Sequence, residues 1–307
     1  WRHQLKFLGE LGYHVVAPDM RGYGRSSVYK DHEAYSQREI NLDMVELFTS
    51  LGKKEAIWIG HDWGSPVVWN MALHHPDKVK AVCSLCVPLG FGEHPENLMN
   101  TVNREIYPVE EYPAGQWDYQ FHYYENFDDA QKEMDEDPYK LVKILFRKGD
   151  PMGLGLPAGT STTRKNKGWF GEFGGVPDLP IDEEVISEED AKTFAKYLKE
   201  NTFFGPNSWY VNSEENQIFR DSVKDQTLEM PSLFVHATFD YVCDTTSSPK
   251  FAASTMEACK NLTEKRIDCG HWMGVCEFRH IACSAHVHAA PDGTCLCVGH
   301  RIPYQIR

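Results

Sequence analysis

The chain has 307 residues, of which 41% are hydrophobic and 25% are charged, and its formal net charge at pH 7 is −14. This length and composition fit a soluble protein with a full hydrophobic core, while the negative charge argues against nucleic acid or an anionic membrane as a partner. No apolar run reaches the roughly 20 residues that a membrane-spanning helix needs. The nine cysteines lack the spacing of a small disulfide framework, so we expect reduced thiols and a cytoplasmic location.

The first part of the chain alternates helix and strand patterns. A short amphipathic helix pattern ends at Gly12, and residues 13–20 form an apolar run typical of a buried strand, followed by a glycine-rich turn at 21–24. Helical spacing resumes over 39–51, and 79–87 is another apolar run. Strands that alternate with helices predict a parallel sheet with helices on both faces.

A Gly-His-Asp-Trp-Gly motif at residues 60–64 lies between these elements. A short apolar strand pattern leads into the motif and a helical pattern follows it, which is the sequence form of a nucleophile elbow. Glycine suits both flanks because a Cβ there would collide with the tightly folded turn. The central residue is Asp62 in place of the usual Ser. A carboxylate can attack carbon without a base, and the resulting ester must then be hydrolysed. The alternative is an acidic turn without a catalytic role.

From about residue 90 the strand patterns give way to short amphipathic helix patterns, at 138–147, 188–199 and 208–223. A loop rich in Gly, Pro and Thr, residues 149–180, separates the first two. Helices inserted into an α/β core are typical of a lid over an active site. We therefore interpret residues 90–224 as an inserted helical cap, and call them the cap segment.

The sheet pattern returns after the cap segment. An apolar strand pattern at 231–237 ends shortly before Asp240, and a last strand pattern at 263–267 ends shortly before His271. Asp62, Asp240 and His271 thus each follow the carboxyl end of a predicted strand, where sites assemble in open α/β sheets. Their order along the chain, nucleophile, acid and histidine, is the order of the α/β-hydrolases.

The tail, residues 274–307, has neither a helical nor a strand period. It contains four cysteines and four histidines, Cys276, Cys283, Cys295, Cys297, His280, His286, His288 and His300. Zinc prefers such ligands, but the spacings match no common zinc motif, so we expect no metal and interpret the tail as foreign to the fold. The Cys-x-x-Cys pair Cys83 and Cys86 lies in an apolar strand pattern and is interpreted as buried thiols.

The predicted fold class is α/β, an α/β-hydrolase fold whose mostly parallel sheet is flanked by helices and carries an inserted helical cap. Residues 1–89 form the first part of the core, 90–224 the cap, 225–273 the second part of the core and 274–307 the atypical tail.

From Trp1 to about Trp272 the sequence resembles the soluble epoxide hydrolases, α/β-hydrolases with an Asp nucleophile. The resemblance rests on four motifs, at residues 19–27, 60–64, 117–120 and 204–210. It implies that Tyr119 and Tyr210 donate hydrogen bonds to the epoxide oxygen, because a phenol that titrates near pH 10 keeps its proton at neutral pH. The alternative is that both tyrosines only pack the lid.

The resemblance also implies a two-step reaction. Asp62 attacks an epoxide carbon, and a water activated by His271, which Asp240 orients, then hydrolyses the ester to release a vicinal diol. The backbone N–H of Trp63 would bind the developing oxyanion. No cofactor or metal is implied. The expected partner is a small hydrophobic epoxide, with no nucleic acid and no membrane, and a homodimer is left open.

Two other functions compete with this one. A haloalkane or haloacid dehalogenase shares the Asp nucleophile and the following Trp, but it has no use for paired tyrosines. A non-catalytic, truncated α/β-hydrolase-like protein is the second alternative. The family's His-Gly-x-Pro segment, which supplies another oxyanion N–H, would lie upstream of Trp1. We therefore expect the first strands of the sheet to be missing, apolar surface to be exposed, and residues 1–307 to be poorly soluble and slow.

Overall fold

The computed structural model describes residues 1–91, 95–276 and 293–299. At its centre is a six-stranded sheet with the order β1-β6-β2-β3-β4-β5, in which every neighbouring pair is parallel. The strands are β1 (His14–Val16), β2 (Ala56–His61), β3 (Val79–Leu85), β4 (Leu228–Ala237), β5 (Cys259–Ile267) and β6 (Thr294–Val298). A parallel sheet accompanied by helices is the arrangement that the sequence predicts.

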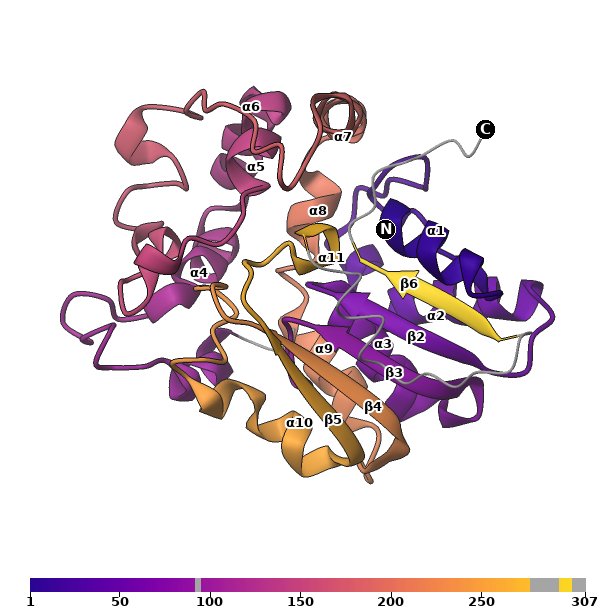
Figure 1. Cartoon of the computed structure of the whole chain (residues 1–307). Coiled ribbons are helices and arrows are strands. Elements are labelled where there is room, and N and C mark those ends of the chain that lie inside the picture. Colours follow the sequence, from indigo (N-terminus) through magenta and orange to yellow (C-terminus); the bar gives the residue numbers. More distant parts are fainter. Residues whose placement is uncertain (92–94, 277–292, 300–307) are drawn as a thin grey trace.

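The helices fall into two groups. Those that accompany the sheet are α1 (Arg2–Glu10), α2 (Gln37–Ser50), α3 (Gly64–His74), α9 (Ser213–Asp221), α10 (Ala253–Ala258) and α11 (Met273–Cys276). The cap segment, which also includes α9, contributes α4 (Asp118–Glu125), α5 (Phe127–Glu136), α6 (Pro138–Leu145), α7 (Glu188–Asn201) and α8 (Phe204–Ser208). Figure 1 shows helices α4 to α7 grouped beyond the carboxyl ends of the strands. None of the helices in the described ranges is long and apolar enough to cross a membrane.

Local sequence explains where the core helix α2 begins and ends. The Ser36 hydroxyl accepts a hydrogen bond from the backbone N–H of Glu39, which caps the first turn. Ile40, which is fully buried, lies on the face that packs into the core. The helix ends before Gly52, whose φ of 63° suits glycine at a helix C-terminus.

Two predicted elements are shorter or more broken than their patterns indicate. The strand predicted at 13–20 is reduced to β1, three residues that pair with β6 alone. The helix predicted at 208–223 is interrupted between α8 and α9. There the side-chain amide of Asn212 donates to the backbone carbonyls of Ser208 and His32, both at 2.7 Å. An Asn that bonds to nearby backbone in this way favours a turn over a continuous helix.

The tail contributes a strand, which corrects the expectation that it has no strand period and is foreign to the fold. Strand β6 lies between β1 and β2, and all five of its residues are buried. Leu296 pairs with Val16 on one side and with Trp58 on the other. The gap that we expected in the sheet on this side of β2 is therefore filled by the tail strand.

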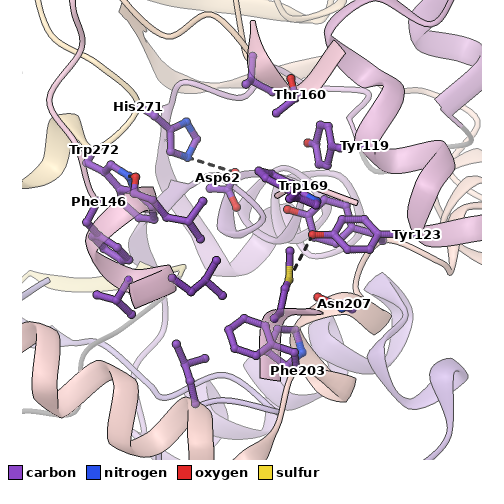
Figure 2. A pocket seen from close by; sticks show the side chains of 18 of the residues that line it. Asp62, Tyr119, Tyr123, Phe146, Thr160, Trp169, Phe203, Asn207, His271 and Trp272 are labelled. Carbon is purple, nitrogen blue, oxygen red and sulfur yellow. Dashed lines mark hydrogen bonds and ion pairs between the residues drawn. The ribbon is translucent and has the colours of Figure 1, made fainter. Parts of the chain in front are cut away.

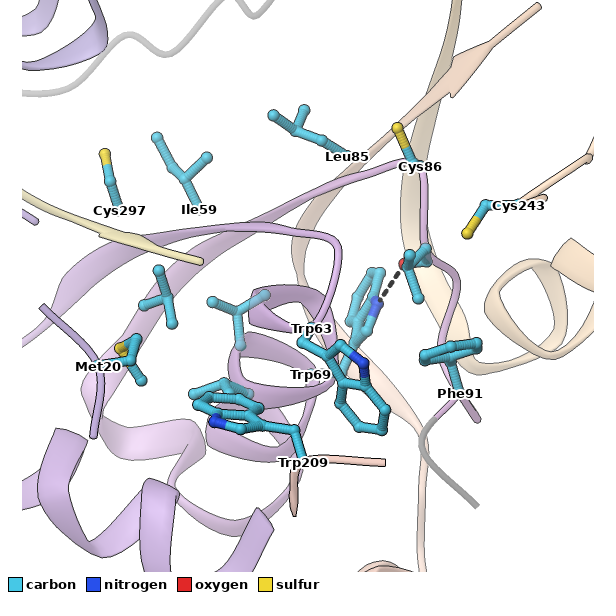
Figure 3. Packing of buried hydrophobic residues seen from close by; sticks show 14 of the residues in the cluster. Met20, Ile59, Trp63, Trp69, Leu85, Cys86, Phe91, Trp209, Cys243 and Cys297 are labelled. Atoms are coloured by element: carbon cyan, nitrogen blue, oxygen red, sulfur yellow. Dashed lines mark hydrogen bonds between the residues drawn. The ribbon is translucent and has the colours of Figure 1, made fainter. Parts of the chain in front are cut away.

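Large aromatic side chains fill the core around the elbow helix. Trp58 and Trp69 are almost completely buried, and the Trp69 indole N–H donates to the backbone carbonyl of Val87 at 3.3 Å (Figure 3). Trp63 packs edge-on against Trp209, with ring centroids 6.2 Å apart. Since Trp209 follows α8, this contact joins the cap segment to the elbow.

Candidate active site

The turn between β2 and α3 holds Asp62 in a strained backbone conformation. Its φ is 54°, in the left-handed region that side chains other than glycine rarely adopt. A Cβ on Gly60 would collide with the backbone of Gly64, and one on Gly64 would collide with the backbone of Val298 at the end of β6. Both glycines are therefore required by close packing, and the second one by the tail strand.

Asp62, Asp240 and His271 are brought together at the carboxyl ends of the strands. The His271 Nδ1–H donates to Asp240 Oδ2 at 2.7 Å, and His271 Nε2 lies 3.3 Å from Asp62 Oδ2 (Figure 2). The other Asp240 oxygen, Oδ1, accepts from the backbone N–H groups of Val242 and Cys243 at 3.1 and 2.9 Å. These bonds fix the Asp240 carboxylate, which in turn orients the imidazole.

The positive charge of a protonated His271 and the negative charges of Asp240 and Asp62 stabilise each other. Burial lowers the pKa of His271, but the charge of Asp240 and hydrogen bonds to Asp240, Asp62 and Cys243 outweigh burial and raise the pKa well above its usual value. Burial raises the pKa of Asp240, yet the charge of His271 and the hydrogen bonds to Asp240 lower it overall. The geometry therefore favours a protonated imidazole held between two carboxylates.

The backbone carbonyl of His271 accepts hydrogen bonds from two side chains. The His61 Nε2–H donates to the His271 carbonyl at 2.8 Å, and the Cys86 thiol donates to the same oxygen at 3.3 Å. Cys86 has a φ of 68° and is buried, so it turns sharply just after β3. Cys83 is also buried, in β3 itself, so both thiols of the pair are buried as predicted.

A cavity of about 270 Å³ lies above Asp62 and His271. Its other walls come mainly from the cap segment and are mostly apolar. They include Met134, Leu141, Val142, Leu145, Phe146, Trp169, Phe194, Leu198 and Phe203. Figure 2 shows Tyr119, Tyr123 and Trp169 on the side of the cavity opposite His271. The cavity is therefore of the size and lining that suit a small, largely apolar molecule.

Tyr119 and Tyr210 both line this cavity together with Asp62. Their ring centroids are 5.7 Å apart, and the Tyr210 ring lies edge-on to Trp63 at 5.0 Å. Burial raises the pKa of each phenol well above 10, and for both the nearby Asp62 carboxylate adds to the shift. Both phenols therefore keep their protons and are available as hydrogen-bond donors.

Tyr123 is a third tyrosine in the cavity, and the sequence analysis did not single it out. Its ring lies 4.7 Å from that of Tyr210, and its hydroxyl contacts Met134 Sδ at 3.6 Å. The spacing of Tyr119 and Tyr123, one helical turn apart on α4, could have indicated that both face the same side.

The tail places no thiol in the cavity within the described ranges. Cys295 and Cys297 are buried in β6. The Cys276 side chain and residues Cys283, His280, His286, His288 and His300 lie outside what the structure describes. The described residues that could hold a metal ion are instead grouped around His271.

Residues 1–275 match the family model of the α/β hydrolase fold. The bifunctional epoxide hydrolase 2 of Sus scrofa is 33% identical over 274 residues, which cover 89% of this chain and 45% of that protein. The chain thus spans about half the length of that relative. Epoxide hydrolase A of Mycobacterium tuberculosis is 30% identical over 276 residues, which cover 89% of this chain and 80% of that protein.

Solved structures give the same result. The crystal structure of epoxide hydrolase A from Mycobacterium thermoresistibile superposes with a TM-score of 0.72 and 26% sequence identity, covering 92% of this chain and 84% of that one. An epoxide hydrolase from an endophytic Streptomyces superposes with a TM-score of 0.72 at 22% identity, over 98% of this chain and 88% of that one, and indicates the shared fold.

Proposed function

Because this chain belongs to the epoxide hydrolase family of the α/β-hydrolase fold, we propose that it hydrolyses epoxides to vicinal diols through an ester on Asp62. The observation that carries the proposal is the Asp62–His271–Asp240 arrangement at the floor of an apolar cavity whose cap wall holds two protonated tyrosines. The substrate is a small hydrophobic epoxide.

In the first step an Asp62 carboxylate oxygen attacks an epoxide carbon and the carbon–oxygen bond of the ring breaks. Tyr119 and Tyr210 stabilise the departing oxygen by hydrogen bonds, and one phenol gives it a proton. Their raised pKa values fit this role as donors. Residues 90–224 act as a cap that keeps water away, over a core formed by 1–89 and 225–273.

The second step hydrolyses the ester. Esterification removes the charge of Asp62, which is one of the groups that raise the pKa of His271. His271 then loses its proton more readily, to the phenolate left by the first step, and takes a proton from a water that attacks the ester carbonyl, while Asp240 stabilises the imidazolium that forms. The ester bond then breaks, one of the two protons of the water leaves with the diol and the other stays on His271, and Asp62 is again a carboxylate. The backbone N–H of Trp63, which follows Asp62 at the start of α3, stabilises the oxyanion.

The paired tyrosines also favour this reaction over dehalogenation. A halide leaves as a stable anion and needs no proton, whereas an epoxide oxygen leaves as an alcohol and must receive a proton. An assay with a chloroalkane tests the alternative, since halide release without diol formation from epoxides would favour a dehalogenase.

The central test uses the variant His271→Gln, which keeps the side-chain size but cannot act as the base. We expect the Asp62 ester to accumulate after mixing with a styrene-type epoxide, detected as a mass increase on the Asp62 peptide. The control Asp62→Asn should show no adduct and no turnover. An enzyme that consumes epoxide while Asp62 stays unmodified would contradict the proposal.

A further inference from the structure

A thiol lies beside His271 and has no role in the reaction described above. The Cys243 sulfur, a ring nitrogen of His271 and a carboxylate oxygen of Asp240 all lie within 4.8 Å of one another. All three residues line the cavity, so a solute that enters the cavity reaches them. We call these three residues the Cys243 cluster.

We propose that the Cys243 cluster is a binding site for a thiophilic divalent cation, Cd²⁺ or Zn²⁺, which inhibits the enzyme. The ion displaces one proton from the Cys243 thiol and one from the His271 ring, and the resulting thiolate, imidazole and carboxylate form a donor set that these ions prefer. In a tetrahedral zinc site, bonds of about 2.0–2.3 Å place neighbouring ligand atoms roughly 3.3–3.8 Å apart. His271 Nδ1 and Asp240 Oδ2 are only 2.7 Å apart, so these two atoms must separate slightly to hold an ion.

The surroundings favour this cluster over its neighbour. A second group, His61, Cys86 and His271, also has its donor atoms within 4.8 Å. However, His61 and Cys86 both donate to the His271 backbone carbonyl, and an ion there would break both hydrogen bonds. Cys243 lines the cavity whereas Cys86 is not among its lining residues. The ion therefore reaches Cys243 directly.

The ion should stop the reaction at a defined point, a consequence that rests on the proposed function. A metal bound to His271 replaces the proton that Nδ1 shares with Asp240, so the ring no longer activates water. The attack of Asp62 on the epoxide does not need His271 as a base. We therefore expect each metal-bound enzyme to consume one epoxide and to retain it as the Asp62 ester, without releasing diol.

The direct test measures Cd²⁺ binding to the full chain by the sulfur-to-cadmium charge-transfer absorption in the ultraviolet. We expect one bound ion whose absorption disappears in Cys243→Ser and persists in Cys83→Ser. Cys83 is the matched control, because it is also a buried thiol but does not line the cavity. Inhibition by Cd²⁺, compared with the metal-free activity of each variant, should need at least about tenfold more metal in Cys243→Ser.

A second variant covers the case in which Cys243→Ser folds poorly. His271→Gln keeps the thiol and removes the imidazole, so it should also weaken Cd²⁺ binding. Unchanged binding in both variants, or binding that depends on Cys86 instead, would overturn the proposal. Cd²⁺ absorption that depends on Cys243, in a protein that does not hydrolyse epoxides, would support the metal site and contradict the proposed function, so the two failures are distinguishable.

Discussion

The core side and the cap side of the cavity hold their polar groups by different means. On the core side, Asp62, Asp240 and His271 are joined by contacts of 2.7 and 3.3 Å and follow the ends of strands. On the cap side, Tyr119 and Tyr210 are placed mainly by ring packing, with centroids 5.7 Å apart, although the Tyr119 hydroxyl also accepts a hydrogen bond from Gln120 at 3.2 Å. Hydrogen bonds fix individual atoms, whereas ring packing fixes a surface. Substitutions should therefore be far more damaging on the core side than on the cap side.

The largest effect is expected in β6, because the core side depends on an intact sheet. Leu296 is fully buried, and Leu296→Asp would place an unpaired carboxylate inside the sheet at a cost of several kcal/mol. The whole stability of a domain is about 5–15 kcal/mol, so we expect the variant to unfold or to lose most of its stability. Urea unfolding followed by circular dichroism measures this.

The matched control for β6 is Leu11→Asp. Leu11 follows α1 and is 55% exposed, so a carboxylate there remains hydrated and should change stability little. Equal stability of the two variants would mean that β6 is not a structural part of the core, and the role that we assign to the tail strand would fail.

The next effect is expected at Asp240. Asp240→Asn keeps the shape of the side chain but removes the charge that orients His271 and stabilises its protonated form. The same change at the corresponding acid of a serine protease triad lowers kcat by about 10⁴, and we expect a loss of that order in ester hydrolysis. Rapid-quench measurement of both steps should show ester formation much less affected. Equal slowing of the two steps would contradict the proposal that Asp240 acts mainly in ester hydrolysis.

On the cap side, graded losses are expected. Tyr119→Phe and Tyr210→Phe each remove one donor and keep the ring, so each should slow epoxide opening less than the double variant does. The double variant should lose about 10²–10⁴ in rate, the range for a positioned general acid. Tyr123→Phe is the control in the same cavity. Its hydroxyl contacts Met134 Sδ, and it should change the rate by only a few-fold. A wild-type rate in the double variant would mean that the two tyrosines only pack the lid.

The same contrast explains what the sequence could predict. The elbow is a local pattern, because two glycines and a preceding apolar strand define the turn within a few residues. Strand β6 could not be found in this way. Its five residues belong to a stretch rich in Cys and His, and its pairing partners β1 and β2 lie more than 230 positions earlier in the chain. Strand pairing at such separation is set by the packed sheet and not by local periodicity.

The hydrogen bonds that side chains donate to distant backbone carbonyls could not be predicted from the sequence either. Asn212 interrupts the predicted helix 208–223 by donating to the carbonyl of His32, 180 positions away. His61 and Cys86 meet at the His271 carbonyl, which lies 210 and 185 positions from them. Residue type and spacing predicted the three side chains of the core side, but not the groups that hold their main chain.

The smallest effect is expected at Cys86, where the core side is held by a weak donor. Cys86→Ala removes the thiol hydrogen bond to the His271 carbonyl and leaves His61 as the donor. A hydrogen bond contributes about 0.5–1.5 kcal/mol, so the rate of ester hydrolysis should fall by at most roughly tenfold, with the rate of ester formation unchanged. Cys86→Asn should restore the rate, because Asn tolerates the φ of 68° and its amide can donate to the same carbonyl. If the Ala and Asn variants behave alike, the thiol only fills space. If Ala alone slows hydrolysis, the position of the His271 main chain is part of the catalytic geometry, and the core side is sensitive even to contacts that never touch the substrate.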